Sequence, residues 1–237
     1  MLPIIKKFYK TIENRKVLEV PDMEAPITHV HVFHKEYPRM PYVDLPRYDT
    51  DSELEVLFGM RESTRVFSDE PLKRDEIAKI LGSCRIVDAS RQPERRTYPS
   101  GGARFPVELY LVSFNIVDVE SGAYHYNMKK GRLEQLWKKD LISIRRELIS
   151  PYLENPAATI IFTAVISRSE VKYGARAYPY ALIETGHMGQ NIHLACAEIG
   201  IGSCSVSGFV DSTVKEMLDV TDGEIPIYTI SIGRKRR

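Results

Sequence analysis

One uninterrupted apolar run constrains the fold of this chain more than any other feature. Residues 158–166 read ATIIFTAVI, a stretch of strand length that lacks a regular alternation of polar and apolar residues. A strand that is apolar on both faces needs cover on both sides, which is typical of a strand in the interior of a sheet. The run therefore predicts a sheet with this segment at its centre.

Local patterns elsewhere predict both helices and strands. Apolar residues at helical spacing, N-caps and helix-ending glycines predict helices over five ranges: 52–59, 70–84, 131–149, 179–198 and 212–220. Stretches rich in β-branched and aromatic residues predict strands at 106–114 and 225–233, and residues 116–127 predict a hairpin that turns at Ser121 and Gly122. Because these elements interleave without strict β-α-β order, they favour an α+β sandwich over a doubly wound sheet.

The first fifty residues differ from the rest of the chain. Residues 1–50 are rich in Pro, Tyr and His and show no sustained helical period, which predicts an extended arm that lies on another surface. Residues 51–237 are predicted to form the folded domain. Within its long helix, small residues such as Gly186 and Gly189 indicate close backbone packing, either inside one subunit or at the centre of a homodimer.

Composition excludes several classes of protein. The 237 residues carry a formal net charge of +1, which gives no global case for a nucleic-acid or membrane partner. No apolar run approaches the roughly 18 residues of a membrane helix, and the start of the chain lacks a signal-peptide layout. Three scattered cysteines predict neither disulfides nor a metal site, so we expect a cytoplasmic protein without a bound metal.

A pair of arginines flanks a serine in the stretch MRESTRVF. Arg61, Ser63 and Arg65 occupy alternate positions, so in an extended segment their side chains point the same way. Guanidinium groups match phosphate oxygens, and the hydroxyl can donate a further bond. The pattern by itself is typical of a solvated basic turn and is also compatible with an anion site.

Two glycine-rich stretches invite a close backbone approach. The first is PSGGA at 99–103, and the second is GIGSCSVSGF at 200–209, predicted as a loop. Neither has the order of a Walker loop or a dinucleotide-binding turn. The chain ends in GRKRR, which could be a solvated tail, a nucleic-acid tether or a wall of an anion site.

Three motifs in this order resemble the nitroreductase superfamily of FMN flavoproteins. They are RESTR, then YPSGGARFPVELYLV, then KYGARAYPYALIETGHMGQNIHLACAEIGIGSCSVSGF. The chain is most similar to the branch of SagB-type dehydrogenases, the azoline oxidases of thiazole and oxazole peptide maturation. The resemblance implies an α+β sandwich with a central, mostly antiparallel sheet flanked by helices, an obligate homodimer, and FMN bound at the dimer interface.

The resemblance also assigns roles to cofactor-binding residues. Arg61 and Ser63 match positions at the FMN phosphate and ribityl end, and Arg65 matches a basic residue beside flavin N1 and the C2 carbonyl. The loop that lies on the isoalloxazine is matched by Ser100, Gly101 and Gly102. The backbone N–H groups that face flavin N5 and O4 are matched by Ser207 and Gly208. Arg234 and Arg236 are candidates for completing the phosphate site.

The same resemblance identifies Lys172 and Tyr173 as the Lys-Tyr pair of the SagB-type branch. Turning an azoline into an aromatic azole removes a proton from one carbon and a hydride from its neighbour. The flavin would take the hydride, while Lys172 or Tyr173 would take the proton. Lys172 would have to be neutral for that role, a state that burial favours.

Alternatives remain open at this point. The same fold could serve a general NAD(P)H-dependent nitro- or quinone-reductase in which Lys172 is incidental. From another class, the chain could be a non-catalytic flavin- or nucleic-acid-binding protein that uses its basic tail. The expected partners are a second subunit and a small-molecule or peptide-azoline-like substrate, with NAD(P)H as a possible electron donor.

Overall fold

The computed structural model describes residues 1–16, 35–47, 51–137, 141 and 144–236. Its centre is a six-stranded sheet in the order β5-β4-β3-β6-β8-β7, in which every pair of neighbours is antiparallel. The strands span the following residues: β3 Val107–Ser113, β4 Gly122–Asn127, β5 Arg132–Trp137, β6 Ala158–Val165, β7 Ile201–Val206 and β8 Glu224–Arg234. The apolar run thus forms the interior strand β6, as predicted.

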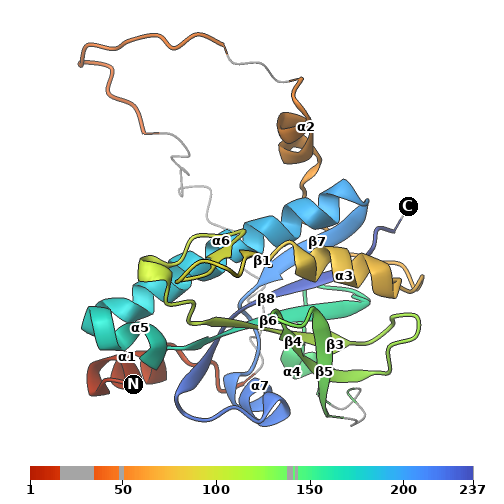
Figure 1. The fold of residues 1–237 in the computed structure, drawn as a ribbon. Helices are drawn as coiled ribbons and strands as arrows, with labels where there is room; N and C mark the ends of the chain where they lie inside the picture. Colours follow the sequence, from red (N-terminus) through yellow and green to blue (C-terminus); the bar gives the residue numbers. More distant parts are fainter. Residues whose placement is uncertain (17–34, 48–50, 138–140, 142–143, 237) are drawn as a thin grey trace, which may run out of the picture.

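Helices cover both faces of this sheet (Figure 1). The long helix α6 (Ala177–Glu198) and α3 (Arg74–Gly82) lie on one face, while α7 (Asp211–Leu218) and the single turn α4 (Arg145–Leu148) lie on the other. Alternate residues of a strand point to opposite faces, so Ile160 enters one core and Ile161 enters the other. The structure therefore confirms an α+β sandwich with a central antiparallel sheet.

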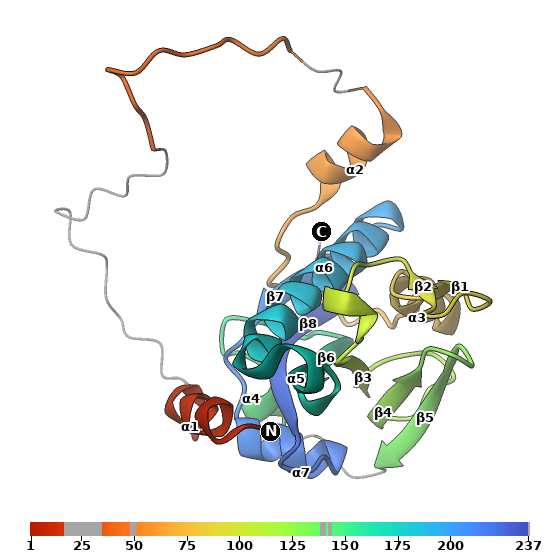
Figure 2. The ribbon, with the colours of Figure 1, turned by 60° about the vertical axis from the view of Figure 1, so that its left-hand side comes forward.

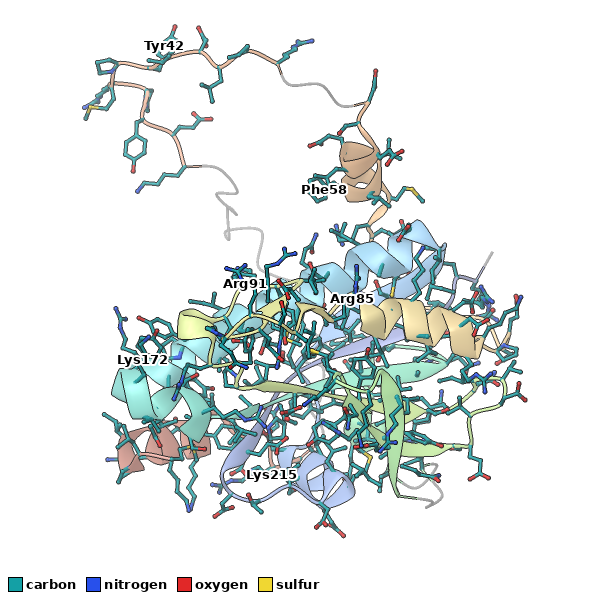
Figure 3. All side chains as sticks on the ribbon, in the orientation of Figure 1. Tyr42, Phe58, Arg85, Arg91, Lys172 and Lys215 are labelled. Carbon is teal, nitrogen blue, oxygen red and sulfur yellow. The ribbon has the colours of Figure 1, made fainter. Side chains whose placement is uncertain are left out.

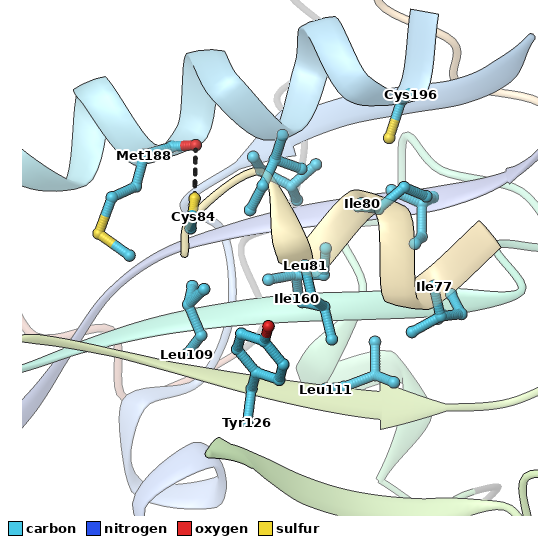
Figure 4. Close-up of a cluster of buried hydrophobic side chains, with 14 of the residues drawn as sticks. Ile77, Ile80, Leu81, Cys84, Leu109, Leu111, Tyr126, Ile160, Met188 and Cys196 are labelled. Carbon is cyan, nitrogen blue, oxygen red and sulfur yellow. Dashed lines mark hydrogen bonds between the residues drawn. The ribbon is translucent and has the colours of Figure 1, made fainter. Parts of the chain in front are cut away.

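The core under α6 and α3 consists of buried hydrophobic side chains (Figure 4). Ile77, Ile80 and Leu81, the predicted inner face of α3, are each at most 2% exposed. The Cys84 thiol donates to the Met188 carbonyl of α6 at 3.5 Å. All three cysteines are buried and free.

The remaining elements are short. A two-stranded ribbon pairs β1 (Ile86–Asp88) with β2 (Arg95–Arg96), and α5 (Ser167–Tyr173) precedes α6. Single 3-10 turns occupy Gly101–Ala103 and Gly174–Arg176. The helix α2 (Glu53–Met60) begins with the predicted N-cap, where the Ser52 hydroxyl accepts from the Glu55 N–H at 3.3 Å. In the described residues, no helix has the length and apolarity needed to cross a membrane.

The amino-terminal residues differ from the extended arm that we predicted. Residues Pro3–Ile12 form the helix α1, and Ile5 and Tyr9 on its inner face are 3% and 5% exposed. The spacing of Ile5, Phe8, Tyr9 and Ile12 is itself helical, so the signal was present but hidden by the irregular residues that follow. Residues 35–47 are exposed and lack helix or strand, whereas 17–34 and 48–50 lie outside the described residues.

Three other local predictions were wrong. The helix predicted over 131–149 is instead the edge strand β5 followed by α4, because pairing with β4 overrides the helical spacing of apolar residues there. Gly122 does not turn a hairpin but opens β4, which pairs with β3. Most of the stretch predicted as a loop over 200–209 is the strand β7, whose backbone pairs with β8.

Candidate functional site

The RESTR segment lies along the outer edge of β7. Ser63 forms a parallel bridge with Ser203, and the Thr64 N–H donates to the Ser203 carbonyl at 3.0 Å. Glycine makes this approach possible, because a Cβ on Gly202 would lie 2.7 Å from Thr64 Cγ2. The partner of Gly202 in β8, Gly233, similarly leaves room for Phe67. Two paired glycines therefore seat this segment against the sheet.

The extended backbone turns Arg61, Ser63 and Arg65 away from the glycines. Thr64, the intervening residue, packs on Gly202, whereas Ser63 and Arg65 are exposed and Arg61 is half-buried. Within the described residues, neither guanidinium has a carboxylate at ion-pair distance. Both cations are thus available to an anionic ligand.

His193 of α6 connects this edge to the hydroxyls of β7. Its Nδ1 lies 2.7 Å from Ser203 Oγ and its Nε2 lies 2.5 Å from Ser205 Oγ. Burial, helped by the nearby Arg61, lowers the pKa of His193 to about 4, so the ring is neutral at physiological pH. The sequence alone does not show these two partners of His193, because they lie on another element.

A cavity of about 280 Å³ adjoins Arg65. Its other walls are Ser150, Tyr152, Leu153, Cys204, Ser205 and Val206. Burial raises the pKa of the Cys204 thiol and Arg65 opposes the rise, so the thiol stays protonated. The predicted pair Ser207 and Gly208 directly follows the last strand residue of this wall.

The basic tail lies near the same edge but its side chains are engaged. Phe67 bridges to Lys235, so the fold does bring the RESTR segment and the tail together. Arg234 pairs with Glu76 at 2.9 Å and with Glu70 at 3.4 Å. Lys235 pairs with Glu62 at 2.8 Å, and Arg236 lies 3.8 Å from Glu154. Each described cation of the tail therefore already faces a carboxylate.

A second group of predicted residues meets near the start of α6, where Lys172 is labelled in Figure 3. A Cβ on Gly102 would lie 2.2 Å from the Tyr173 Oη and 3.0 Å from the Lys172 Nζ. Gly102 has a φ of 63°, in the left-handed region. Lys172 is exposed and Tyr173 is half-buried, and the Lys172 Nζ lies 5.3 Å from the centre of the Tyr173 ring. The structure thus joins the PSGG turn to the Lys-Tyr pair.

The side chains of Ser100 and Tyr180 also contact the backbone of this turn. The Ser100 hydroxyl accepts from the Phe105 N–H at 2.9 Å, and a Cβ on Gly101 would contact Tyr180 at 3.4 Å. Tyr180 packs edge-on against Tyr173, with ring centroids 5.0 Å apart. Serine and glycine at these positions therefore serve a compact turn beneath two aromatic rings.

Glu184 is a buried acid beside this turn that sequence reasoning missed. The residue is 2% exposed, and within the described residues neither carboxyl oxygen has a donor in full hydrogen-bond geometry. Burial raises its pKa to about 7, although the Ser100 hydroxyl, the Val107 N–H and the more distant Arg96 and Arg168 oppose the rise. A small cavity of about 240 Å³ lies between this turn and α6. Only the fold reveals this acid, since an isolated Glu in a helix is usually exposed.

The candidate residues of one chain form two groups along α6 (Figure 2). The turn at Gly101–Ala103 and α5 lie at the amino-terminal half of this helix, and β7 with the RESTR segment lies at its carboxy-terminal half. Glu184 and His193, which mark the two groups, are separated by roughly 14 Å at the rise of an α-helix. In the described part of the chain, no three His, Cys, Asp or Glu side chains gather as a metal site.

Comparisons with known proteins agree with this architecture. The chain matches the family model of the nitroreductase family over residues 59–234. It is 29% identical to MJ1384 of Methanocaldococcus jannaschii over 198 residues, which are 81% of this chain and 96% of that protein. It is 32% identical to the microcin B17-processing protein McbC of Escherichia coli, over 75% of each chain.

A solved structure extends the likeness to the whole chain. One chain of the Escherichia coli microcin synthetase McbBCD complex, determined with truncated pro-MccB17 bound, matches with a TM-score of 0.78. The match covers 100% of this chain and 95% of that chain at 24% identity, so it shows a shared fold. Together with the family match and the similarity to McbC, it confirms the resemblance drawn from the three motifs: the chain belongs to the nitroreductase family.

Proposed function

We propose that this chain is an FMN-dependent oxidoreductase of the SagB type that removes two hydrogens from an azoline-like substrate. The observation that carries the proposal is the contact between the PSGG turn and the Lys-Tyr pair. Two groups that take a proton in their deprotonated forms, the Lys172 amine and the Tyr173 phenolate, lie directly over the backbone of Gly102. A basic edge and a cavity lie further along α6, where a phosphorylated cofactor would fit.

The residues of the β7 edge suit FMN. Arg61 and Ser63 would hold the phosphate, since a guanidinium without a carboxylate partner favours a bound anion. Arg65 would lie at the flavin ring, beside the cavity that it lines. Arg234 and Arg236 remain candidates only if they leave their present carboxylates.

When bound, FMN would supply the acceptor for the substrate hydride. The part of this chain is to take the accompanying proton, at the Lys172 Nζ or the Tyr173 Oη. An exposed lysine is normally charged, and Lys172 is exposed in the single chain. A second subunit or the substrate would therefore have to cover Lys172, because desolvation favours the neutral amine that accepts a proton.

The helix α2 supports a homodimer. Its residues Leu54, Val56, Phe58 and Met60 are between 44% and 54% exposed, and none of its residues is buried. Figure 1 and Figure 2 show this helix projecting from the domain near the end of α6, which it contacts. An apolar helix needs a covering surface, and we propose that a second copy supplies it.

The substrate class rests on similarity. McbC processes microcin B17, and the McbBCD complex was determined with a truncated pro-peptide. A peptide-azoline-like substrate is therefore proposed here over a simple nitro compound or quinone. The paired carboxylates of the tail give no support to a nucleic-acid tether at residues 234–236.

Purified protein tests the cofactor first. Its absorbance spectrum and mass spectrometry of the heat-released ligand should identify FMN near one per subunit. A colourless protein that fails to bind added FMN would end the proposal. Lys172→Ala should then abolish azoline oxidation, whereas unchanged NAD(P)H-driven reduction of quinones, with no azoline oxidation by the wild type, would favour the general reductase.

Light scattering tests the dimer. Phe58→Glu places a charge on the exposed apolar side of α2 and should produce monomers. Val117→Glu, in the loop between β3 and β4 and 43% exposed, is the matched control because it replaces an exposed apolar residue by the same charge outside α2. A wild-type monomer that binds FMN fully would contradict the homodimer.

A further inference from the structure

The amino-terminal helix α1 bridges the two parts of the candidate site. At its start, the Leu2 N–H donates to the Glu170 carboxylate of α5, the helix that carries Lys172 and Tyr173. Beyond its end, Asn14 contacts the loop that contains Ser207 and Gly208. Figure 2 shows α1 beside α5 and α7. A segment that sequence patterns placed outside the domain is thus part of its framework.

Asn14 makes a dense set of hydrogen bonds with this loop. Its side-chain Nδ2 donates to the carbonyls of Ser207 and Phe209, each at 3.0 Å. Its backbone N–H donates to the Asp211 carboxylate at 2.8 Å, and its carbonyl accepts from the Asp211 N–H at 3.1 Å. One side-chain amide therefore spans the two carbonyls on either side of Gly208.

The surroundings hold Asn14 in place. The Tyr9 hydroxyl donates to Asp211, which is 4% exposed. Lys215 of α7, labelled in Figure 3, lies 4.6 Å from the centre of the Tyr9 ring and 3.6 Å from the Glu13 carboxylate. A buried carboxylate with several donors is a rigid anchor, because breaking one bond leaves a costly unpaired group.

Because the peptide bond is planar, the hydrogen bond from Asn14 to the Ser207 carbonyl also fixes the direction of the Gly208 N–H. In a trans peptide, the Ser207 carbonyl and the Gly208 N–H lie in the same plane and point in opposite directions. Asn14 holds the carbonyl, so the N–H points away from α1. Further along the loop, the Val210 N–H donates to the Glu147 carbonyl at 2.8 Å. Among the described residues, the Gly208 N–H has no such acceptor.

We propose that Asn14 is a positioning residue that aims the Gly208 N–H at the bound cofactor. The inference rests on the proposed function, in which this N–H faces the reactive edge of the flavin. It goes further by making α1 a working part of the site. A backbone donor held in one direction stabilises charge that develops opposite it, at no cost of reorganisation during the reaction.

Asn14→Asp tests this inference with little change of shape. The variant cannot donate to the two carbonyls, and its carboxylate repels them. We expect its dissociation constant for FMN to rise by about five-fold per lost hydrogen bond, in fluorescence titrations. Sulfite, which adds to the flavin beside this N–H, should bind the holoprotein more weakly, as measured from the visible absorbance. Asn14→Ala, which only removes the amide, should show both effects.

Two controls separate positioning from stability. Asn115→Asp loses the same kind of bond, from its amide to the Asp69 carbonyl at 2.8 Å, outside this loop. Ile5→Ala weakens the packing of α1 without touching the bonds of Asn14. Both controls should keep FMN and sulfite affinities within about two-fold of the wild type, a shift smaller than the loss of one hydrogen bond.

Each outcome decides the matter. Loss of both affinities in the Asn14 variants alone supports the inference. Equal affinities in Asn14→Asp and Asn115→Asp, or losses in Ile5→Ala that match those in Asn14→Ala, would overturn it while leaving FMN use intact. Wild-type protein that does not bind FMN would instead overturn the proposed function and this inference together.

Discussion

Replacing Gly102 by alanine should strain the turn beneath the Lys-Tyr pair in two separable ways. The backbone φ of 63° is unfavourable for any residue with a Cβ, by about 1–2 kcal/mol. The new Cβ would also lie 2.2 Å from the Tyr173 Oη, so the Tyr173 side chain must move. Forcing it off its rotamer by about 30° costs a further 0.5–1.5 kcal/mol or so.

Gly131→Ala isolates the first of these costs. Gly131 has nearly the same φ, 59°, but a Cβ there would meet no atom within 4 Å. Any gain from the smaller conformational freedom of the unfolded chain is common to both variants and cancels in their difference. Gly102→Ala should therefore destabilise the protein by about 1 kcal/mol more than Gly131→Ala does.

A double variant confirms the source of the excess. Adding Tyr173→Phe to Gly102→Ala removes the Oη and relieves the 2.2 Å contact, although the ring atom Cζ at 3.1 Å remains tight. The free energy of unfolding should then recover most of the excess. Urea unfolding followed by circular dichroism, on protein without added FMN, measures the loss in each of these three variants and in Tyr173→Phe alone, which is the reference for the double variant. Equal losses in Gly102→Ala and Gly131→Ala would refute the contact between the turn and Tyr173.

Three further predictions concern charge. Arg61→Ala should weaken FMN binding by about 1.5–3 kcal/mol per lost bond. Arg234→Ala should leave the affinity near that of the wild type, because its guanidinium already pairs with carboxylates. Fluorescence titrations that show equal losses in the two variants would contradict this and would make Arg234 a ligand of the phosphate. Burial raises the pKa of Glu184 to about 7 from 4.5, so this carboxyl stabilises the fold when protonated and loses that contribution as pH rises between these values. Glu184→Gln should accordingly be more stable than the wild type by up to about 3 kcal/mol above pH 7, and a difference that is constant with pH in urea unfolding would contradict the burial of the charge. Because the pKa of His193 is lowered to about 4, the fold loses stability as pH falls from about 6.5 through 4. His193→Gln should lessen that loss. An imidazole of His193 that titrates near pH 6.5 by NMR would contradict the lowered pKa.

Much of the framework of the fold could be predicted from local patterns. The apolar run of β6, the inner face of α3 and the length of α6 follow from the period of the side chains, which neighbours in the sequence determine. The three motifs also pointed to the family that the comparisons confirm. These features depend on residues that stand close together in the chain.

Patterns failed where pairing with a distant strand outweighed local preference. The apolar spacing after Gly131 is helical, yet β4 offers an edge that turns residues 132–137 into β5. The same holds for β7, whose glycines and serines resemble a loop until β8 pairs with them. Backbone groups along a sheet edge gain hydrogen-bond partners only when the strands meet. The sequence of one segment therefore does not show which strand it will pair with.

Residue types along the chain show which side chains could carry the chemistry, but folding selects the ones that come into contact. RESTR, PSGG and the Lys-Tyr pair can be recognised in the sequence, because their residue types suit phosphate binding, close backbone approach and proton transfer respectively. Only the fold brings Tyr173 onto Gly102, engages Arg234 with carboxylates, buries Glu184 and ties Asn14 to the Ser207 carbonyl. Folding has this effect because hydrogen bonds, ion pairs and burial act over a few ångströms in space, whatever the separation along the chain.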